Sequence, residues 1–175
     1  SSDRGKTWAK RGSIPFPSTD WNETQLLEKK DGSLQMFSRV GFRKIGFMAS
    51  ESRDGGRTWT PMAKTPLLGL PPHLLALPDG RLVCAYGRRV GEYGFGVFAA
   101  VSDDDGRTWD TANEICLRPC HNGDLGYPSS CVLPNGDILT VYYQQKSEGE
   151  KQVSIARNFK PGYMYDIVLR FSDHG

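Results

Sequence analysis

Short apolar runs alternate with turn sequences along the whole chain, and no window shows a sustained helical period of apolar positions. Three of these runs end at an Asp-Gly or Asn-Gly pair, at residues 31–32, 79–80 and 135–136. Such pairs between apolar runs favour a hairpin, because both turn residues tolerate a positive φ. The pattern predicts an inner strand before each turn and a second strand after it, at Leu34–Arg39, Leu82–Arg88 and Ile138–Gln144.

A second motif, Ser-x-Asp-x-Gly-x-Thr-Trp, begins at Ser1, Ser52 and Ser102. Consecutive copies begin about 50 residues apart, a period typical of propeller blades. The Asp side chain can accept hydrogen bonds from the backbone of its own turn, the Gly can adopt a positive φ, and the Trp can pack against a neighbouring unit. The motif therefore predicts a self-closing turn with a structural role. Phe171–Gly175 reads as the beginning of a fourth copy.

The two motifs together divide the chain into three units of four short antiparallel strands, which is the pattern of β-propeller blades. Third strands are expected before the Asp motifs and fourth strands after the Trp, at Ile45–Ser50, Phe95–Ser102, either Val153–Phe159 or Tyr165–Phe171, and Ile115–Arg118. We expect an all-β fold in which residues 1–175 form part of a single propeller, with blade repeats at 9–59, 60–109 and 110–175. Because three blades cannot close a ring, we expect a longer natural chain or, as the less favoured option, pairing with a second copy.

Composition excludes several classes of protein. The 175 residues carry a net charge of +2 without long charged runs, which argues against a nucleic-acid partner. No apolar stretch approaches the roughly 20 residues of a membrane span. Cys116, Cys120 and His121 lack a second ligand pair at zinc spacing, and the run Asp103–Asp105 lacks the remaining oxygen ligands of a calcium loop. We therefore expect neither a metal nor another cofactor.

Alignment of the units on their glycine turns brings chemistry-bearing residues to equivalent places. Glu23 and Tyr127 each stand eight residues before a turn, and Pro71 holds this position in the middle unit, followed two residues later by His73. Because inner-strand ends surround the central channel of a propeller, Glu23 and Tyr127 should both face the channel mouth.

Arginines end two of the second strands. Arg39 and Arg88 hold these places, and Arg89 follows directly. An arginine beside the channel can hold a carboxylate through two parallel hydrogen bonds.

Over essentially the whole chain, these motifs resemble the sialidases (neuraminidases) and their relatives with Asp-box, or BNR, repeats. The Ser-x-Asp-x-Gly-x-Thr-Trp boxes carry the structural resemblance, and the segments Trp21–Arg39 and Gly126–Gly136 carry the functional one. The resemblance implies a six-bladed propeller that hydrolyses terminal sialic acids from a glycan substrate with retention. A tyrosine paired with a glutamate is the nucleophile, three arginines clamp the sugar carboxylate, and an aspartate is the acid/base. A secreted or cell-envelope location is favoured by the same resemblance.

Carried over by position, the resemblance makes Tyr127 the nucleophile, Glu23 its general base and Arg39 one clamp arginine, with Arg88 or Arg89 as another. The first arginine and the acid/base aspartate belong to an early blade that this chain does not contain. A neutral phenol suits the reaction, because the carboxylate on the anomeric carbon of a sialic acid would repel an attacking Asp or Glu.

Two alternatives to a sialidase stay open. One is a sialidase-like hydrolase of another sugar, in which His73, Asp124 and Tyr127 form the site. The other is a non-catalytic carbohydrate-binding or scaffolding propeller. A Glu23 carboxyl within hydrogen-bond reach of the Tyr127 hydroxyl would favour an enzyme, and a separation above about 6 Å would favour the binder.

Overall fold

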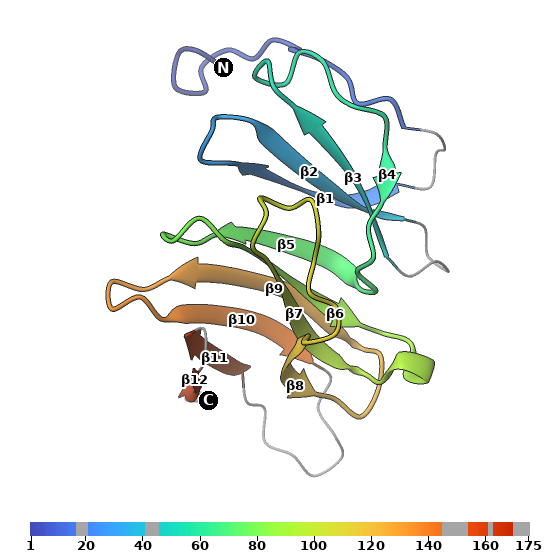
Figure 1. Ribbon diagram of the computed structural model, residues 1–175, viewed down its shortest axis with the longest axis vertical. Coiled ribbons are helices and arrows are strands. Elements are labelled where there is room, and N and C mark those ends of the chain that lie inside the picture. Colours follow the sequence, from blue (N-terminus) through green and yellow to red (C-terminus); the bar gives the residue numbers. More distant parts are fainter. Residues whose placement is uncertain (17–20, 41–45, 145–153, 161–162, 170–175) are drawn as a thin grey trace.

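The computed structural model contains three four-stranded antiparallel sheets stacked on one another (Figure 1). It describes residues 1–16, 21–40, 46–144, 154–160 and 163–169. A single 3-10 turn, Gly91–Tyr93, is the only helical element in these ranges, and none of the described helices could cross a membrane. The expected all-β fold of four-stranded blades is confirmed.

Each sheet uses four consecutive strands, so neighbours in the chain are neighbours in the sheet. Blade 1 contains β1 (Trp21–Glu28), β2 (Leu34–Val40), β3 (Phe47–Ser52) and β4 (Ala63–Lys64). Blade 2 contains β5 (Leu70–Ala76), β6 (Leu82–Arg88), β7 (Gly96–Ser102) and β8 (Ile115–Pro119). Blade 3 contains β9 (Leu125–Val132), β10 (Ile138–Gln144), β11 (Ser154–Lys160) and β12 (Tyr163–Leu169).

The sheets divide the chain slightly later than the expected repeats do. Blades 1 and 2 take their outer strands, β4 and β8, from beyond the Trp of the Asp motif, so the divisions fall at 64–70 and 119–125 rather than at 59 and 109. In blade 3, β11 is the third strand, which decides between the two segments expected there. The partial fourth motif, Phe171–Gly175, lies outside the described residues.

The Asp motif closes its own turn as expected. Asp54 accepts hydrogen bonds from the backbone N–H and the hydroxyl of Thr58, at 2.9 and 2.6 Å. The Ser52 hydroxyl accepts the N–H of Gly56 at 2.9 Å, and Gly56 has a φ of 85°. The hydrogen bonds from Thr58 hold the pKa of the Asp54 carboxyl well below its usual range. These contacts lie within one turn, so they account for the motif as scaffold.

Two apolar cores hold the blades together, one between each pair of neighbouring sheets. Trp109 of the third Asp motif lies in the core between blades 1 and 2, with its ring centroid 5.6 Å from that of Phe37 on β2. Trp8 of the first motif is 80% exposed, because none of the described residues forms a blade against it. The core between blades 2 and 3 contains Leu77, Val83, Ala85, Val97, Ala99, Leu117, Leu125, Ile138 and Tyr142.

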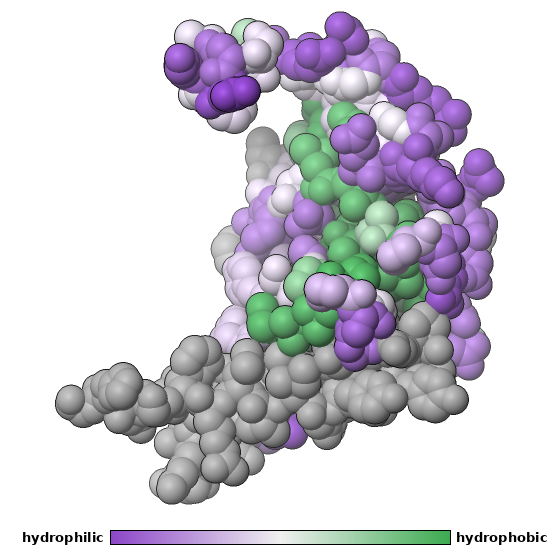
Figure 2. Space-filling view, turned by 90° about the vertical axis from the view of Figure 1, so that its left-hand side faces the viewer, coloured by the Kyte–Doolittle hydropathy of each residue, from purple (hydrophilic) through white to green (hydrophobic). Residues whose placement is uncertain are grey.

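The inner strands lie side by side, with β5 between β1 and β9 (Figure 1). Their C-terminal ends lead into the three glycine turns on one side of the molecule. On the face turned toward the viewer in Figure 2, apolar residues form a central band flanked by hydrophilic ones. The N-terminal ends of the inner strands lie together at the opposite end of the blades, and this end holds the candidate site.

Candidate active site

Each inner strand carries a one-residue β-bulge near its N-terminal end. In blade 1, Asn22 and Glu23 together stand opposite Arg39. Tyr127 lies in the corresponding bulge of β9, and Pro71 lies in that of β5. Bulges re-aim side chains and are common beside active sites. The equal offsets of Glu23 and Tyr127 from their turns therefore correspond to one repeated irregularity of the blades.

The backbone at Tyr127 is unusual for a residue with a large side chain. Its φ is 49°, in the left-handed region, at a cost on the order of 1–3 kcal/mol. Gly126 precedes it with a φ of 128°, and a Cβ on Gly87 of β6 would lie 2.9 Å from the Gly126 Cα. This close packing of β6 against the beginning of β9 holds the strained segment in place and leaves the Tyr127 side chain 50% exposed.

The Tyr127 hydroxyl donates a short hydrogen bond to Oε1 of Glu23, joining blade 3 to blade 1. Arg39 Nη1 in turn donates to both carboxylate oxygens of Glu23, each at 3.1 Å. The Arg39 side chain is 7% exposed and that of Glu23 is 33% exposed. The phenol, the carboxylate and the guanidinium are therefore joined by hydrogen bonds into one network that runs from solvent into blade 1.

These contacts set the protonation state of the pair. Partial burial by itself would raise the pKa of the Glu23 carboxyl, but the Tyr127 hydrogen bond and the charge and hydrogen bonds of Arg39 outweigh it, so the pKa lies below the usual 4.5. The hydrogen bond to Glu23, followed by burial and by the charge of Glu23, raises the pKa of the Tyr127 phenol above 10.0. At neutral pH the acceptor is therefore charged and the phenol protonated, as a base-assisted nucleophile requires.

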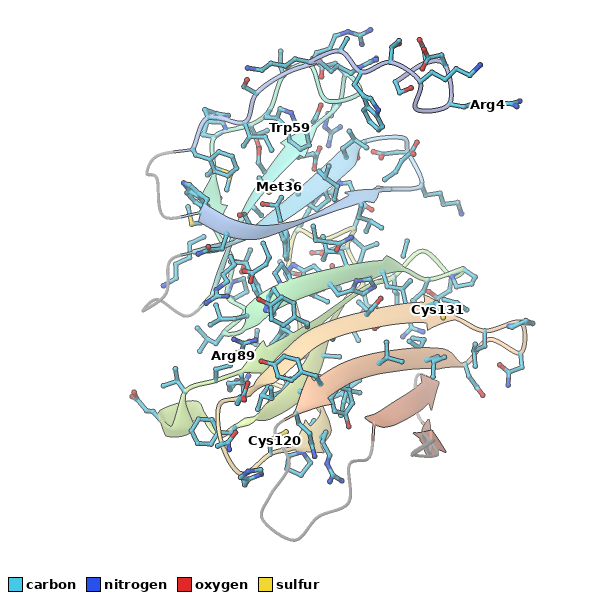
Figure 3. All side chains as sticks on the ribbon, turned by 180° about the vertical axis from the view of Figure 1, so that it is seen from behind. Arg4, Met36, Trp59, Arg89, Cys120 and Cys131 are labelled. Carbon is cyan, nitrogen blue, oxygen red and sulfur yellow. The ribbon has the colours of Figure 1, made fainter. Side chains whose placement is uncertain are left out.

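Arg89 and a second tyrosine lie beside Tyr127. The Arg89 Cζ is 5.3 Å from the Tyr127 ring centroid and 5.9 Å from that of Tyr143, and Nη2 donates to the Tyr143 hydroxyl at 3.4 Å. The Tyr143 hydroxyl donates to Oδ1 of Asp124 at 2.9 Å. In Figure 3, Arg89 is labelled at the end of the blades where the inner strands begin, and Cys131 near the end where they finish.

Two residues expected at the site have other partners. Arg88 is buried, pairs with Glu114 at 2.5 Å and lies 4.0 Å over the Phe98 ring. Arg88 is the last residue of β6 and Arg89 follows the strand, and the two side chains have different partners. The Nε2 atom of His73 is 3.0 Å from the backbone carbonyl of Ser130, so this ring ties β5 to β9.

Tyr143 is the member of the group that sequence reasoning missed. It stands eight residues after the turn residue Asn135, as Arg39 stands eight after Asp31, so the same alignment on glycine turns contained the signal. The sheet register pairs Tyr143 with Gly126, directly beside Tyr127.

The geometry suits proton transfer between Tyr127 and Glu23. Glu23 is placed to accept a proton from Tyr127, and Arg89 brings a positive charge beside the phenol ring. Across the described ranges of the chain, His, Cys, Asp and Glu form no group of three or more that could hold a metal ion.

Residues 1–141 match the model of the BNR repeat-like domain family. None of the curated proteins matches the chain significantly.

Several solved structures resemble the chain in fold. A protein of unknown function from Dyadobacter fermentans DSM 18053 has a TM-score of 0.74 at 31% identity, covering 83% of this chain and 40% of that one. The GH93 α-L-arabinofuranosidase of Fusarium graminearum, solved with arabinobiose, has a TM-score of 0.64 at 19% identity, covering 83% and 48%. An ulvan lyase of family PL25 has a TM-score of 0.57 at 13% identity, covering 83% and 43%. The chain thus spans less than half the length of each of these three.

Proposed function

The chain belongs to the BNR repeat-like domain family, and we propose that it supplies the nucleophile side of a retaining glycoside hydrolase site for terminal acidic sugars of the sialic acid class. Tyr127 is the nucleophile and Glu23 is its general base, held by Arg39. The observation that carries the proposal is the hydrogen bond from Tyr127 to Glu23 across an intervening blade. The left-handed backbone of Tyr127 supports it, because strain of this kind concentrates at functional sites.

In the first step the Tyr127 phenol oxygen forms a bond to the anomeric carbon as the glycosidic C–O bond breaks. The phenol proton passes to Glu23, and the leaving oxygen takes a proton from the aspartate that the sialidase resemblance assigns to an earlier blade. In the second step, water attacks the anomeric carbon, that aspartate accepts the water proton, and Glu23 returns its proton to the departing phenol oxygen. Two displacements at one carbon give retention of configuration.

The acidic substrate class rests on the charges around the phenol. A neutral nucleophile is not repelled by a carboxylate on the reacting carbon, whereas an Asp or Glu would be. Arg89 is the arginine next to Tyr127, with its Cζ 5.3 Å from the ring centroid. This guanidinium can therefore take up the sugar carboxylate, while Nη1 of Arg39 is used by Glu23.

A second candidate is hydrolysis of a neutral sugar by the same Tyr127–Glu23 pair. The pairing of Arg88 with Glu114 favours it, because only one of the two alternative clamp arginines, Arg89, then lies beside Tyr127. The structural neighbours include an arabinofuranosidase and an ulvan lyase, so propellers of this fold process sugars other than sialic acid.

Hydrolysis assays on the full-length protein test both candidates. The substrates are 4-methylumbelliferyl sialoside and p-nitrophenyl α-L-arabinofuranoside, and the variants are Tyr127→Phe, Glu23→Gln and, as the control, Tyr142→Phe, whose ring packs in the core. We expect turnover of the sialoside, a loss on the order of 10²–10⁴-fold in Glu23→Gln, and at least as large a loss in Tyr127→Phe.

The control variant Tyr142→Phe should keep its activity. Turnover of the arabinoside alone would move the assignment to the second candidate. Equal activity of wild type and Tyr127→Phe would remove Tyr127 from the mechanism, and glycan binding without turnover would leave a carbohydrate-binding propeller.

A further inference from the structure

A second phenol–carboxylate pair, Tyr143 with Asp124, lies beside the first and has no part in the steps above. We propose that Asp124 and Tyr143 are positioning residues that fix the Arg89 guanidinium against the ring of Tyr127. The catalytic meaning of this inference rests on the proposed function, whereas the positions it assigns can be measured without a substrate.

The direction of the hydrogen bonds supports the assignment. A tyrosine hydroxyl has one proton, and Tyr143 gives it to Oδ1 of Asp124 at 2.9 Å. The lone pairs of the same oxygen are then left for Nη2 of Arg89, which lies 3.4 Å away. Asp124 is itself held, because its backbone N–H donates to the Asn122 side chain at 2.9 Å. The carboxylate thus turns the Tyr143 hydroxyl into an acceptor aimed at Arg89.

The path of the Arg89 side chain supports it as well. A Cβ on Gly126 would lie 3.1 Å from Arg89 Nη2, so the guanidinium passes closely over the glycine that precedes the nucleophile. It also lies near the Tyr127 and Tyr143 rings, and such contacts have little directionality. The Tyr143 hydroxyl therefore supplies the directional contact that fixes the guanidinium.

The position of Arg89 matters for the charge on the nucleophile. Among the described groups that act on the Tyr127 phenol, Glu23 on β1 raises its pKa, while Arg89 after β6 and Arg39 on β2 lower it. Tyr143 on β10 is the neighbouring ring, 5.9 Å away. In the protein without substrate, Arg39 is hydrogen-bonded to Glu23, so Arg89 is the other cation whose charge favours the ionised phenol.

Nuclear magnetic resonance of the full-length protein tests the inference. With ¹³Cζ-labelled tyrosine, the Tyr127 signal is assigned by its loss in Tyr127→Phe and titrated in the wild type, Tyr143→Phe, Asp124→Asn, Arg89→Met and the control Tyr142→Phe. We expect Tyr143→Phe and Asp124→Asn to raise the pKa of Tyr127 toward its value in Arg89→Met, by about half a unit for one displaced charge near 5 Å. The Tyr142→Phe titration should match the wild type.

The Asp124→Asn result separates positioning from direct electrostatics. Removal of a negative charge would by itself lower the pKa of a neighbouring phenol, whereas release of Arg89 raises it. A lowered or unchanged pKa in Asp124→Asn, or an unchanged one in Tyr143→Phe, would overturn the inference.

Relaxation of the Arg89 Nε–H signal gives a second, independent reading. This signal should be ordered in the wild type and mobile in both the Tyr143→Phe and Asp124→Asn variants, and equal order in all three proteins would also overturn the inference. A wild type without hydrolase activity would count against the proposed function alone.

Discussion

The hydroxyl of Tyr127 on β9 donates a hydrogen bond to the carboxylate of Glu23 on β1, although 104 positions separate the two residues in the sequence. Blade 2 lies between their strands, and its equivalent bulge carries Pro71, which has no polar side chain to compete for either partner. Three copies of one strand irregularity thus bring an acid and a phenol from non-adjacent blades to the same place.

Arg39→Met should shift the acid limb of the pH profile of kcat/KM to higher pH. In the wild type the pKa of Glu23 lies below 4.5, partly through the charge and hydrogen bonds of Arg39, so the base form survives into acid solution. Loss of the guanidinium should raise this limb of the kcat/KM profile by about one pH unit or more. Arg53→Met, at a side chain that is 71% exposed, is the control and should leave the profile in place. An unmoved limb in Arg39→Met would show that Glu23 is not the titrating base.

The lowered pKa of Glu23 also predicts a pH-dependent difference in stability between Arg39→Met and the wild type. A carboxyl with a depressed folded pKa contributes stability that is present above the unfolded pKa and is lost as the pH falls through the folded pKa. The part of the free energy of unfolding that Glu23 gains from Arg39 should therefore be present at pH 7 and disappear at pH values well below 4.5. Urea unfolding at several pH values checks this, and a pH-independent difference would contradict it.

Gly87→Ala should impair activity through the backbone of β9. The new Cβ would lie 2.9 Å from the Gly126 Cα and 2.9 Å from the carbonyl oxygen of Leu70, neither of which is a flexible side-chain end. We expect a loss of about 1–3 kcal/mol in the free energy of unfolding and a fall in kcat as Tyr127 is displaced.

Gly80→Ala separates the two effects of Gly87→Ala. Its φ of 95° makes it a strained substitution, yet a Cβ there meets nothing within 4 Å and the residue lies at the turn end of blade 2. This variant should lose stability and keep its kcat below the unfolding temperature. Full activity in Gly87→Ala would show that Tyr127 does not depend on this packing.

Lys29→Met should weaken the contact between blades 1 and 2. The Lys29 side chain is 2% exposed, and its Nζ lies 2.9 Å from Glu51 and 3.1 Å from Asp105 of the third Asp motif. Its removal takes the buried cation away from Asp105 and leaves Glu51 with Arg53, which should cost about 1–3 kcal/mol in the free energy of unfolding. Thermal unfolding measures the loss.

A matched double variant shows whether the Lys29 effect is electrostatic. Asp105 has a φ of 63°, which Asn tolerates, so Lys29→Met combined with Asp105→Asn should recover part of the lost stability. A double variant no more stable than Lys29→Met would mean that the loss comes from packing alone.

Local sequence rules predicted most of the blades correctly. The second strands of blades 2 and 3 have the predicted bounds, because Asp-Gly and Asn-Gly turns fix the beginning of each strand. The Asp motif was equally predictable, since Asp54 makes its hydrogen bonds within its own turn. Trp8 and Trp109 differ strongly in burial despite identical motifs, because burial depends on the neighbouring blade and not on the turn.

The candidate site was only partly accessible from the sequence. Equal offsets from the turns placed Glu23 and Tyr127 together, because both belong to the same repeated bulge. The separation of Arg88 from Arg89 depends on how the chain leaves β6, since one side chain lies against Glu114 and the other beside Tyr127. The Asn-Gly turn predicts that β9 and β10 pair, but the contact between Asp124 and Tyr143 also depends on the register shift within that pair.

Covalent trapping tests most directly whether Tyr127 is the nucleophile. The full-length protein is incubated with a fluorinated sialosyl fluoride, which forms the glycosyl–enzyme bond and slows its hydrolysis, and the labelled residue is located by peptide mass spectrometry. We expect one added sugar on Tyr127, slower labelling in Glu23→Gln and none in Tyr127→Phe. A sugar attached to another residue, or the same extent of labelling in Tyr127→Phe, would contradict this expectation.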